Sequence, residues 1–133
     1  TATLPALQTE ISEAIASFRS WMNELGVWDD VTLFTAGDFG RTVTDNGNGS
    51  DHGWGGHHFI AGGSVKGGKL YGDLPEYDLG AQMYTRSRGR LIPTTSVEQY
   101  AATLGRWLGL SEADLKTVFP NLSNFSEPFL DFV

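Results

Sequence analysis

The 133-residue sequence predicts an α/β fold, and two neighbouring segments near its start support that prediction. Apolar residues recur there at spacings of three and four, as on one face of an amphipathic helix: Leu4, Leu7, Ile11, Ile15, Phe18, Met22 and Leu25. The β-branched and aromatic run at residues 31–35 comes soon after and is typical of a short buried strand. A helix, a tight turn and a buried strand make up half of an α/β unit.

The predicted helix covers residues 5–25. Pro5 suits its first turn, where the missing N–H costs no hydrogen bond. Gly26 suits the left-handed conformation that follows the last turn of many helices. Local chemistry therefore bounds this helix at both ends.

The centre of the chain shows no periodicity, since Gly, Asn, Asp and Thr dominate from Gly37 to Gly56. We expect a long Gly/His-rich loop here, and loops of such length in compact domains are usually functional or disordered. A second short strand is expected at residues 57–61. A Gly-Gly pair then lies between two strand-like arms, which predicts a hairpin at residues 65–71.

Two further helices are predicted near the end of the chain. Ser96 and Gln99 have the spacing of a capping box, and apolar residues continue after them with helical spacing. A shorter helix is expected to begin after Ser111. It should end near Phe119, because Pro120 disfavours helical backbone in the residue before it.

The charge balance limits the classes of partner. The chain has 16 acidic and 9 basic residues, which gives a net charge of -7. This balance argues against nucleic acid and anionic lipid, because phosphate contacts need clustered Lys and Arg. No apolar run approaches the roughly 20 residues that a membrane-spanning helix needs. The absence of Cys excludes disulfides, thiolate metal sites and a Cys nucleophile.

All three His residues share the central Gly-rich stretch with two candidate carboxylates. Asp38 comes just after the predicted strand, where ligands bind in open α/β sheets. Asp51 and His52, with one further imidazole, form an oxygen and nitrogen set that suits Zn²⁺ or another borderline divalent metal. That imidazole comes from His57 or His58. Neighbouring residues on a strand point to opposite faces, so at most one of the two enters the site, and we favour His58.

Each candidate also has an ordinary structural explanation. Asp38 could cap the following turn through its side chain, and Asp51 with His52 could lie in a solvated turn. Of two adjacent His residues on a strand, one is often packed and the other exposed. Arg41 is the cation nearest to the proposed site, and it either holds an anionic substrate group or pairs with Asp38 or Asp45.

Other motifs carry less chemistry. Arg86, Arg88 and Arg90 form a small basic knot, which we interpret as a solvated cluster rather than an anion site. The sequence lacks the Gly-Lys-Ser/Thr ending of a phosphate-binding loop. It also lacks a Ser in the Gly-x-Ser-x-Gly form of a nucleophile elbow.

Three central segments carry a recognisable family pattern: residues 33–42, residues 51–59 with their Asp-His-Gly-Trp-Gly-Gly-His-His run, and residues 62–68. With residues 96–100 and 115–122, they resemble a bacterial family of exported proteins, the domain of unknown function 1501. The resemblance spans nearly the whole chain. That family is grouped with the alkaline phosphatase and sulfatase superfamily.

The resemblance implies a fold and an incomplete site. It implies that residues 1–133 are one unit, the C-terminal part of a longer alkaline-phosphatase-like sandwich in which helices flank a sheet. In the superfamily, two metal ions activate a Ser or Thr nucleophile and clamp a phosphoryl or sulfuryl group. The nucleophile segment belongs to an N-terminal part that is not in this chain. Where related enzymes have an Asp-His pair after the strand, this chain has Asp38-Phe39.

We therefore expect a metal-dependent, hydrolase-like fragment of a periplasmic or extracellular protein, acting on an anionic phosphate or sulfate ester. Zinc is the expected metal, and the candidate ligands are Asp38, Asp51, His52 and His58, with His57 as the alternate. Arg41 would steady the anionic group. The competing interpretation is a catalytically silent assembly component of a larger extracytoplasmic complex. Both interpretations require a partner, either the missing N-terminal portion or another protein chain, and neither involves nucleic acid or a membrane span.

Overall fold

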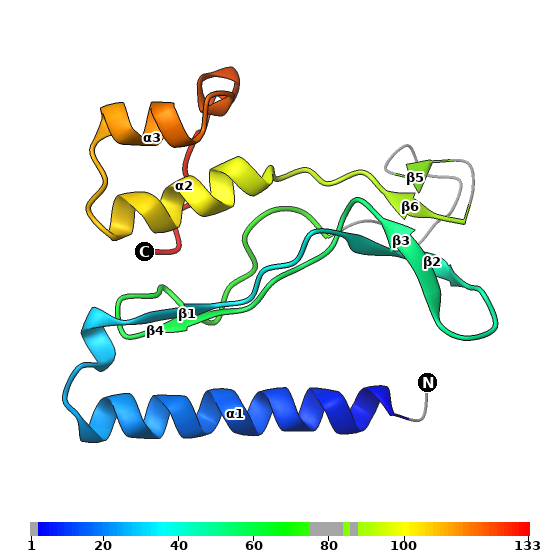
Figure 1. Ribbon diagram of the computed structural model, residues 1–133, viewed down its shortest axis with the longest axis horizontal. Coiled ribbons are helices and arrows are strands. Elements are labelled where there is room, and N and C mark those ends of the chain that lie inside the picture. Colours follow the sequence, from blue (N-terminus) through cyan, green and yellow to red (C-terminus); the bar gives the residue numbers. More distant parts are fainter. Residues whose placement is uncertain (1–2, 75–83, 86–87) are drawn as a thin grey trace. The chain divides into compact units, whose positions relative to one another are not determined.

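The computed structural model describes residues 3–74, 84–85 and 88–133, and it confirms a mixed α/β architecture (Figure 1). The chain divides into two compact units. Unit 1 consists of Thr1–Val65 and Glu76–Ile92, and unit 2 consists of Lys66–Pro75 and Pro93–Val133. Each unit is therefore built from two separate stretches of sequence.

Unit 1 begins with the long helix α1, which covers Leu4–Glu24 and confirms the predicted helix to within one residue at each end. Proline lies in its first turn, as predicted. After its last turn, Gly26 adopts a φ of 71°, the left-handed conformation that ends many helices. No residue of α1 is fully buried, and Ile15, Phe18 and Met22 are half-buried, so the described part of the chain covers its apolar stripe only in part.

Two antiparallel ladders follow and form what we call the interrupted ribbon, residues 32–62. Strand β1 (Thr32–Phe34) pairs with β4 (Ile60–Gly62), and β2 (Gly40–Asp45) pairs with β3 (Ser50–Gly53). Between the ladders, residues 35–39 on one side lie opposite residues 54–59 on the other. The strand predicted at residues 31–35 is confirmed as β1. The pairing of β1 is antiparallel.

The prediction of one long irregular loop at residues 37–56 is wrong, because β2 and β3 form a hairpin there. Thr42-Val43-Thr44 supply the β-branched residues that favour a strand. The connecting turn contains Gly47 and Gly49 at φ values of 95° and 141°, which other residues adopt only with strain. The polar composition that suggested a loop is therefore the composition of a solvated hairpin and its turn.

Close backbone contact holds the interrupted ribbon together next to its gap. A Cβ atom added to Gly40 would lie 1.7 Å from the carbonyl oxygen of Gly55. Gly55 in turn donates its N–H to the carbonyl of Leu91 at 3.1 Å. The carbonyl of Leu91 belongs to the short strand β6 (Arg90–Leu91), which pairs with β5 (Tyr84–Thr85). Glycine at position 40 is thus required by packing rather than by backbone flexibility.

The predicted hairpin at residues 65–71 is not formed. The described residues there are turns and irregular backbone, and the amide of Lys66 donates instead to the carbonyl of Phe132 at 2.8 Å. The hydroxyl of Tyr71 donates to the carbonyl of Lys66 at 2.8 Å. The hydrogen-bond partner of Lys66 is therefore a residue of the C-terminal tail, residues 125–133. The strand predicted at residues 57–61 exists, but it begins only at Ile60.

Unit 2 contains the helices α2 (Val97–Trp107) and α3 (Glu112–Val118), and both confirm the predictions. The capping box at Ser96 is complete, since its side chain accepts the Glu98 N–H at 3.1 Å and its own N–H donates to the Gln99 side chain at 2.9 Å. Ser111 caps α3 in the same way.

The apolar core of the described residues lies in unit 2 and consists of four buried side chains: Ala102, Leu115, Leu122 and Phe132. The tail is fixed to α2 by a hydrogen bond from the Leu130 N–H to the buried Thr103 hydroxyl, 2.8 Å long. Phe132 makes ring contacts with Tyr71 and Tyr100 at 5.9 and 6.0 Å between centroids. The tail is therefore an integral part of the core.

Two expectations about the whole architecture have different outcomes. The sheets of the described residues are three two-stranded antiparallel pairs, so the larger sandwich stays a prediction. Among the described helices, none combines the length and the apolar character needed to cross a bilayer, which agrees with the expectation of no membrane span.

Candidate functional site

The candidate site residues gather along the interrupted ribbon, and three of them lie in its gap. Asp38 lies in the segment 35–39, while His57 and His58 lie in the facing segment 54–59; all three side chains are exposed. The gap is closed at one end by Thr35, whose N–H donates to the Phe59 carbonyl at 2.9 Å. The Thr35 hydroxyl accepts the Phe59 N–H at 2.8 Å and lies 3.4 Å from Nδ1 of His58.

His57 makes a different contact from its neighbour. Its ring meets the ring of Phe59 edge-on, at 6.2 Å between centroids and 82° between planes. Because β4 begins at Ile60, neither His57 nor His58 is on a strand. The strand alternation from which we favoured His58 therefore does not apply, although His58 is the one that contacts the opposite side of the ribbon.

Arg41 and His52 lie next to each other across the β2–β3 ladder, where they are partners in register. The ring of His52 stacks on that of Phe39 at 3.6 Å between centroids and 14° between planes. The guanidinium carbon of Arg41 lies 4.9 Å from the centroid of the same Phe39 ring. Nη1 of Arg41 donates to the carbonyl of Ser50 at 2.8 Å. Arg41 does not pair with Asp38 or Asp45 among the interactions of the described residues.

Asp51 takes part in a separate network of one hydrogen bond and one ion pair on the other face of β3. Its Oδ1 accepts a hydrogen bond from the side-chain amide of Asn46 at 2.7 Å, and its Oδ2 lies 3.3 Å from Nε of Arg88. The Asn46 hydrogen bond, and then the positive charges of Arg88 and Arg90, lower the pKa of the Asp51 carboxyl below its usual value. Adjacent strand residues point to opposite faces, so Asp51 and His52 diverge.

The basic knot is only partly described. Arg86 lies outside the described residues. Arg88 has a positive φ of 57° and pairs with Asp51, so it has a structural role in unit 1. Arg90 lies on β6, opposite Thr85 in register.

The described donors do not fit a zinc site in this arrangement. A catalytic zinc ion uses three protein ligands, and a structural one uses four. Across residues 3–74, 84–85 and 88–133, His, Asp and Glu form no group of three that could hold a metal ion. Asp51 is engaged with Asn46 and Arg88, and His52 is stacked on Phe39. The zinc ligand set therefore stays a prediction from sequence, and we derive no chemistry through a metal.

Sequence reasoning missed two residues that organise this region. Phe39 was treated only as a departure from a family pattern, yet its ring contacts both Arg41 and His52. The spacing of Phe39 and Arg41 was a usable signal, because residues two apart on an extended chain share a face. Thr35 was treated only as part of a strand. No local pattern marks it, since its contacts reach residues 58 and 59 across the ribbon.

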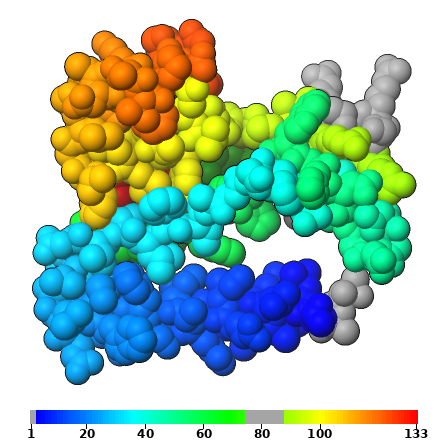
Figure 2. All heavy atoms as spheres, in the orientation of Figure 1, coloured from blue at the N-terminus to red at the C-terminus, as the bar shows by residue number. Residues whose placement is uncertain are grey.

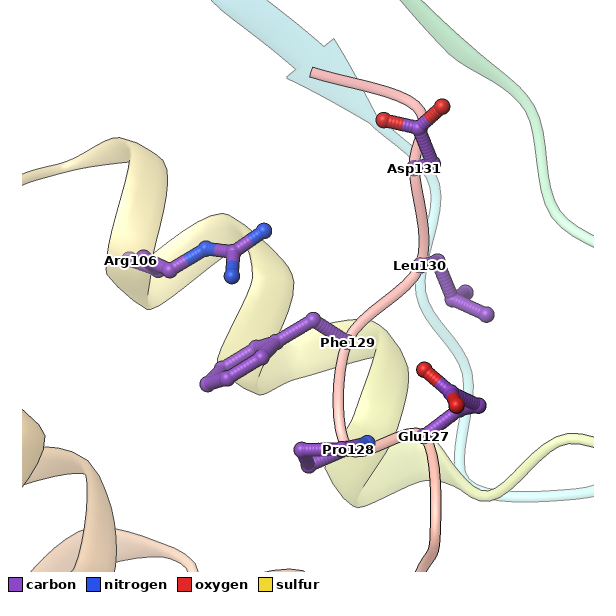
Figure 3. A pocket seen from close by; sticks show the side chains of 6 residues that line it. All are labelled: Arg106, Glu127, Pro128, Phe129, Leu130 and Asp131. Carbon is purple, nitrogen blue, oxygen red and sulfur yellow. The ribbon is translucent and has the colours of Figure 1, made fainter.

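A pocket of about 210 Å³ lies in unit 2, between the C-terminal tail and α2 (Figure 3). Arg106 places its guanidinium carbon 4.0 Å from the ring centroid of Phe129 there. Glu127 and Asp131 also line it, and Asp131 forms an ion pair with Lys66. The contact between Arg106 and Phe129 holds the tail against α2, and the ion pair of Asp131 joins the tail to Lys66. The lining contains none of the predicted site residues.

The fold and the ribbon define a mixed α/β protein with an exposed His- and Arg-bearing hairpin surface. A family model described as "Protein of unknown function (DUF1501)" matches residues 1–118, and the chain belongs to this family. Searches of the curated proteins and of the solved structures gave no match.

Proposed function

We propose that the interrupted ribbon forms one wall of a hydrolase-like site that receives the anionic group of a phosphate or sulfate ester. In this proposal the chain is incomplete by itself, and further groups come from the remainder of a longer alkaline-phosphatase-like sandwich. The proposal draws on the superfamily resemblance and on the local geometry. It also places the protein outside the cytoplasm, as periplasmic or extracellular.

The observation that carries this proposal is the side-by-side placement of Arg41 and His52 on an exposed ladder. Arg41 donates one N–H to the Ser50 carbonyl. A guanidinium has five N–H donors, so several remain for an oxyanion. The acidic neighbour Asp51 is directed to the other face and is partnered by Asn46 and Arg88. A local surface of donors therefore exists on a chain whose net charge is -7.

The test is hydrolysis of aryl phosphate and aryl sulfate esters by the natural full-length protein. Arg41→Gln should lower kcat/KM at least about tenfold, because charge-assisted hydrogen bonds to an oxyanion are among the strong ones. Arg106→Gln is the matched control, since Arg106 belongs to unit 2 and should leave the rate unchanged. Absence of hydrolysis of either ester class, or equal rates for Arg41→Gln and wild type, would contradict the proposal.

The metal prediction has its own experiment. If zinc binds the full-length protein through the predicted ligands, it should raise the Tm, and His52→Ala should remove that rise. The described His, Asp and Glu side chains form no group of three that could hold a metal ion. Zinc binding would therefore require a rearrangement of these side chains or ligands from another part of the full-length protein. A Tm that zinc leaves unchanged in the full-length protein would remove the metal from the proposal.

A second candidate function is an assembly component without catalysis, and α1 is the observation that favours it. Leu4, Leu7 and Ile11 each expose half or more of their surface, and Trp21 and Leu25 expose more than 60%. Figure 2 shows the side chains of α1 at the molecular surface along the helix. A stripe of this kind normally packs on another element.

Purification of the natural protein under mild conditions separates the two functions. A stable complex with another polypeptide, no esterase activity and loss of the complex in Ile11→Asp would support the assembly function. Ser12→Asp, one residue further along the helix and off the stripe, is the matched control.

A further inference from the structure

The rings and the guanidinium around Phe39 form a cluster that we call the Phe39 stack: Phe39, Arg41 and His52. Phe39 precedes β2, Arg41 is the second residue of β2, and His52 lies on β3. The imidazole lies almost parallel to the Phe39 ring, at 3.6 Å and 14°, and the guanidinium carbon lies 4.9 Å from the ring centroid. One aromatic ring therefore touches both of the polar side chains.

The arrangement is fixed by the ladder and does not depend on the side chains alone. Arg41 and His52 are register partners, and directly opposite residues have Cβ atoms only about 4.5–5.5 Å apart on the same face. The hydrogen bond from Arg41 to the Ser50 carbonyl further limits where the guanidinium can go. Gly40 and Gly53, which flank the pair, are also register partners. The backbone thus sets the positions of both donors before any ligand binds.

The chemistry of the two donors matches an oxyanion. The guanidinium is planar, stays charged at all relevant pH values and favours phosphate and sulfate oxygens. A neutral imidazole still carries one N–H, so His52 can donate without being protonated. Phe39 is 41% exposed, and both donors are exposed, which leaves the cluster open to a ligand.

The charges nearest to the stack are placed to permit anion binding. Asp51 is the adjacent carboxylate, and the Arg88 guanidinium and the Asn46 amide hold it on the other face of β3. Asp38 is next to Phe39 in sequence and exposed on the loop before β2. Unit 1 therefore separates an ion-paired carboxylate on one face of β3 from the Arg41 and His52 donors on the other.

We propose that Arg41 and His52 together bind the terminal phosphoryl or sulfuryl oxygens of the ester, and that Phe39 is the positioning residue that holds both donors in place. This inference rests on the proposed function and deepens it. It gives His52 the role of an oxyanion donor in place of the metal ligand expected from sequence. It also explains why an aromatic ring occupies position 39, directly before the strand that carries Arg41.

The probes are inorganic phosphate and inorganic sulfate, titrated into the full chain by calorimetry in the presence of a chelator, so that no metal contributes. Arg41→Gln should weaken binding about tenfold, and His52→Ala about three- to tenfold. Phe39→Leu keeps an apolar side chain but removes the ring, and it should weaken binding about threefold, in line with a surface cation–π contact. Phe39→Tyr restores the ring and should bind as wild type does.

A readout beyond affinity separates positioning from general damage. Phosphate should shift the NMR signals of the His52 ring in wild type and in Phe39→Tyr, and much less in Phe39→Leu. The Tm of each variant shows whether the fold is kept. The ring signals of His57, which contacts Phe59 instead, serve as an internal control.

The outcomes separate the inference from the function on which it rests. If Arg41→Gln weakens phosphate binding while His52→Ala and Phe39→Leu do not, the stack is overturned and the proposed oxyanion site stands. If the folded wild type binds neither anion, the oxyanion site itself is overturned, and the stack with it. If a variant unfolds, the His52 ring shifts of wild type and Phe39→Tyr, both measured on folded protein, still test the stack, and the absence of a shift on adding phosphate overturns it.

Discussion

Units 1 and 2 are stabilised in different ways, although they share one chain. Unit 2 contains all four buried apolar side chains of the described core, together with two complete capping boxes. In the described part of unit 1, the buried residues are Thr42 and three glycines, so backbone contacts and polar hydrogen bonds replace an apolar core. Two-stranded sheets are at best marginally stable alone in water. The described part of the unit that carries the candidate site therefore has no buried apolar side chain to stabilise it.

Removing the tail anchor of unit 2 should have the largest effect. Phe132 is fully buried, and Phe132→Ala should lower the free energy of unfolding by about 3–5 kcal/mol, through lost burial and the cavity left behind. Thermal unfolding measures this, with Leu108→Ala, at a 74% exposed position on the same unit, as the control. Similar small shifts for both variants would mean that unit 2 has no core of the kind described.

The corresponding test of unit 1 targets the close contact between the backbones of Gly40 and Gly55. Gly40→Ala places a methyl group against the Gly55 carbonyl and should cost about 1–3 kcal/mol or open the ribbon locally. Hydrogen exchange at the Gly55 and Thr35 amides measures the opening. Gly37→Ala is the matched control, because the nearest atom to its added Cβ is 3.9 Å away. If the Gly55 and Thr35 amides of Gly40→Ala exchange as slowly as in wild type, backbone contact does not stabilise unit 1 as described.

A smaller effect is expected at the capping box of α2. Ser96→Ala removes the acceptor of the Glu98 N–H and should reduce stability by about 1 kcal/mol. Ser20→Ala, at an exposed position inside α1, should change the Tm little. Equal shifts for the two variants would show that the cap adds nothing to unit 2.

The smallest effect should be an acid sensitivity of unit 1 at Asp51. The fold lowers the pKa of this carboxyl below 3.8, so its contribution to stability is present above that value and is lost as the pH falls through the lowered pKa. Asp51→Asn should flatten this part of the pH profile, as followed by NMR of the β2–β3 amides. Asp131, whose pKa is lowered chiefly by the Lys66 hydrogen bond, supplies the matching variant Asp131→Asn in unit 2. If the Asp51→Asn and wild-type profiles coincide, the network around Asp51 does not stabilise the hairpin.

The same contrast explains how much of the fold was predictable. The helices were predicted to within a residue or two, because a 3.6-residue period, Pro5, Gly26 and the two Ser caps are all local signals. Strands β2 and β3 were missed, because a solvated hairpin has the same polar composition as a loop. Their register depends on contacts between glycines that are far apart in sequence, such as Gly40 and Gly55.

For the candidate site, the sequence indicated the residues but not their grouping. The Asp and His candidates lie along one ribbon, and their convergence on one metal ion stays a prediction. Which of them meet was decided by strand register, which turns Asp51 toward Arg88 and His52 toward Phe39. A one-residue change of register would exchange these faces, and no local pattern fixes it.

The hydrogen bond between the Lys66 amide and the Phe132 carbonyl also has a consequence for biosynthesis. The first stretch of unit 2 leaves the ribosome before the last stretch of unit 1, and the core of unit 2 cannot close until Phe132 has been synthesised. During that interval Tyr71 has no Phe132 ring to pack against, and the nascent polypeptide exposes an apolar surface that a chaperone can bind.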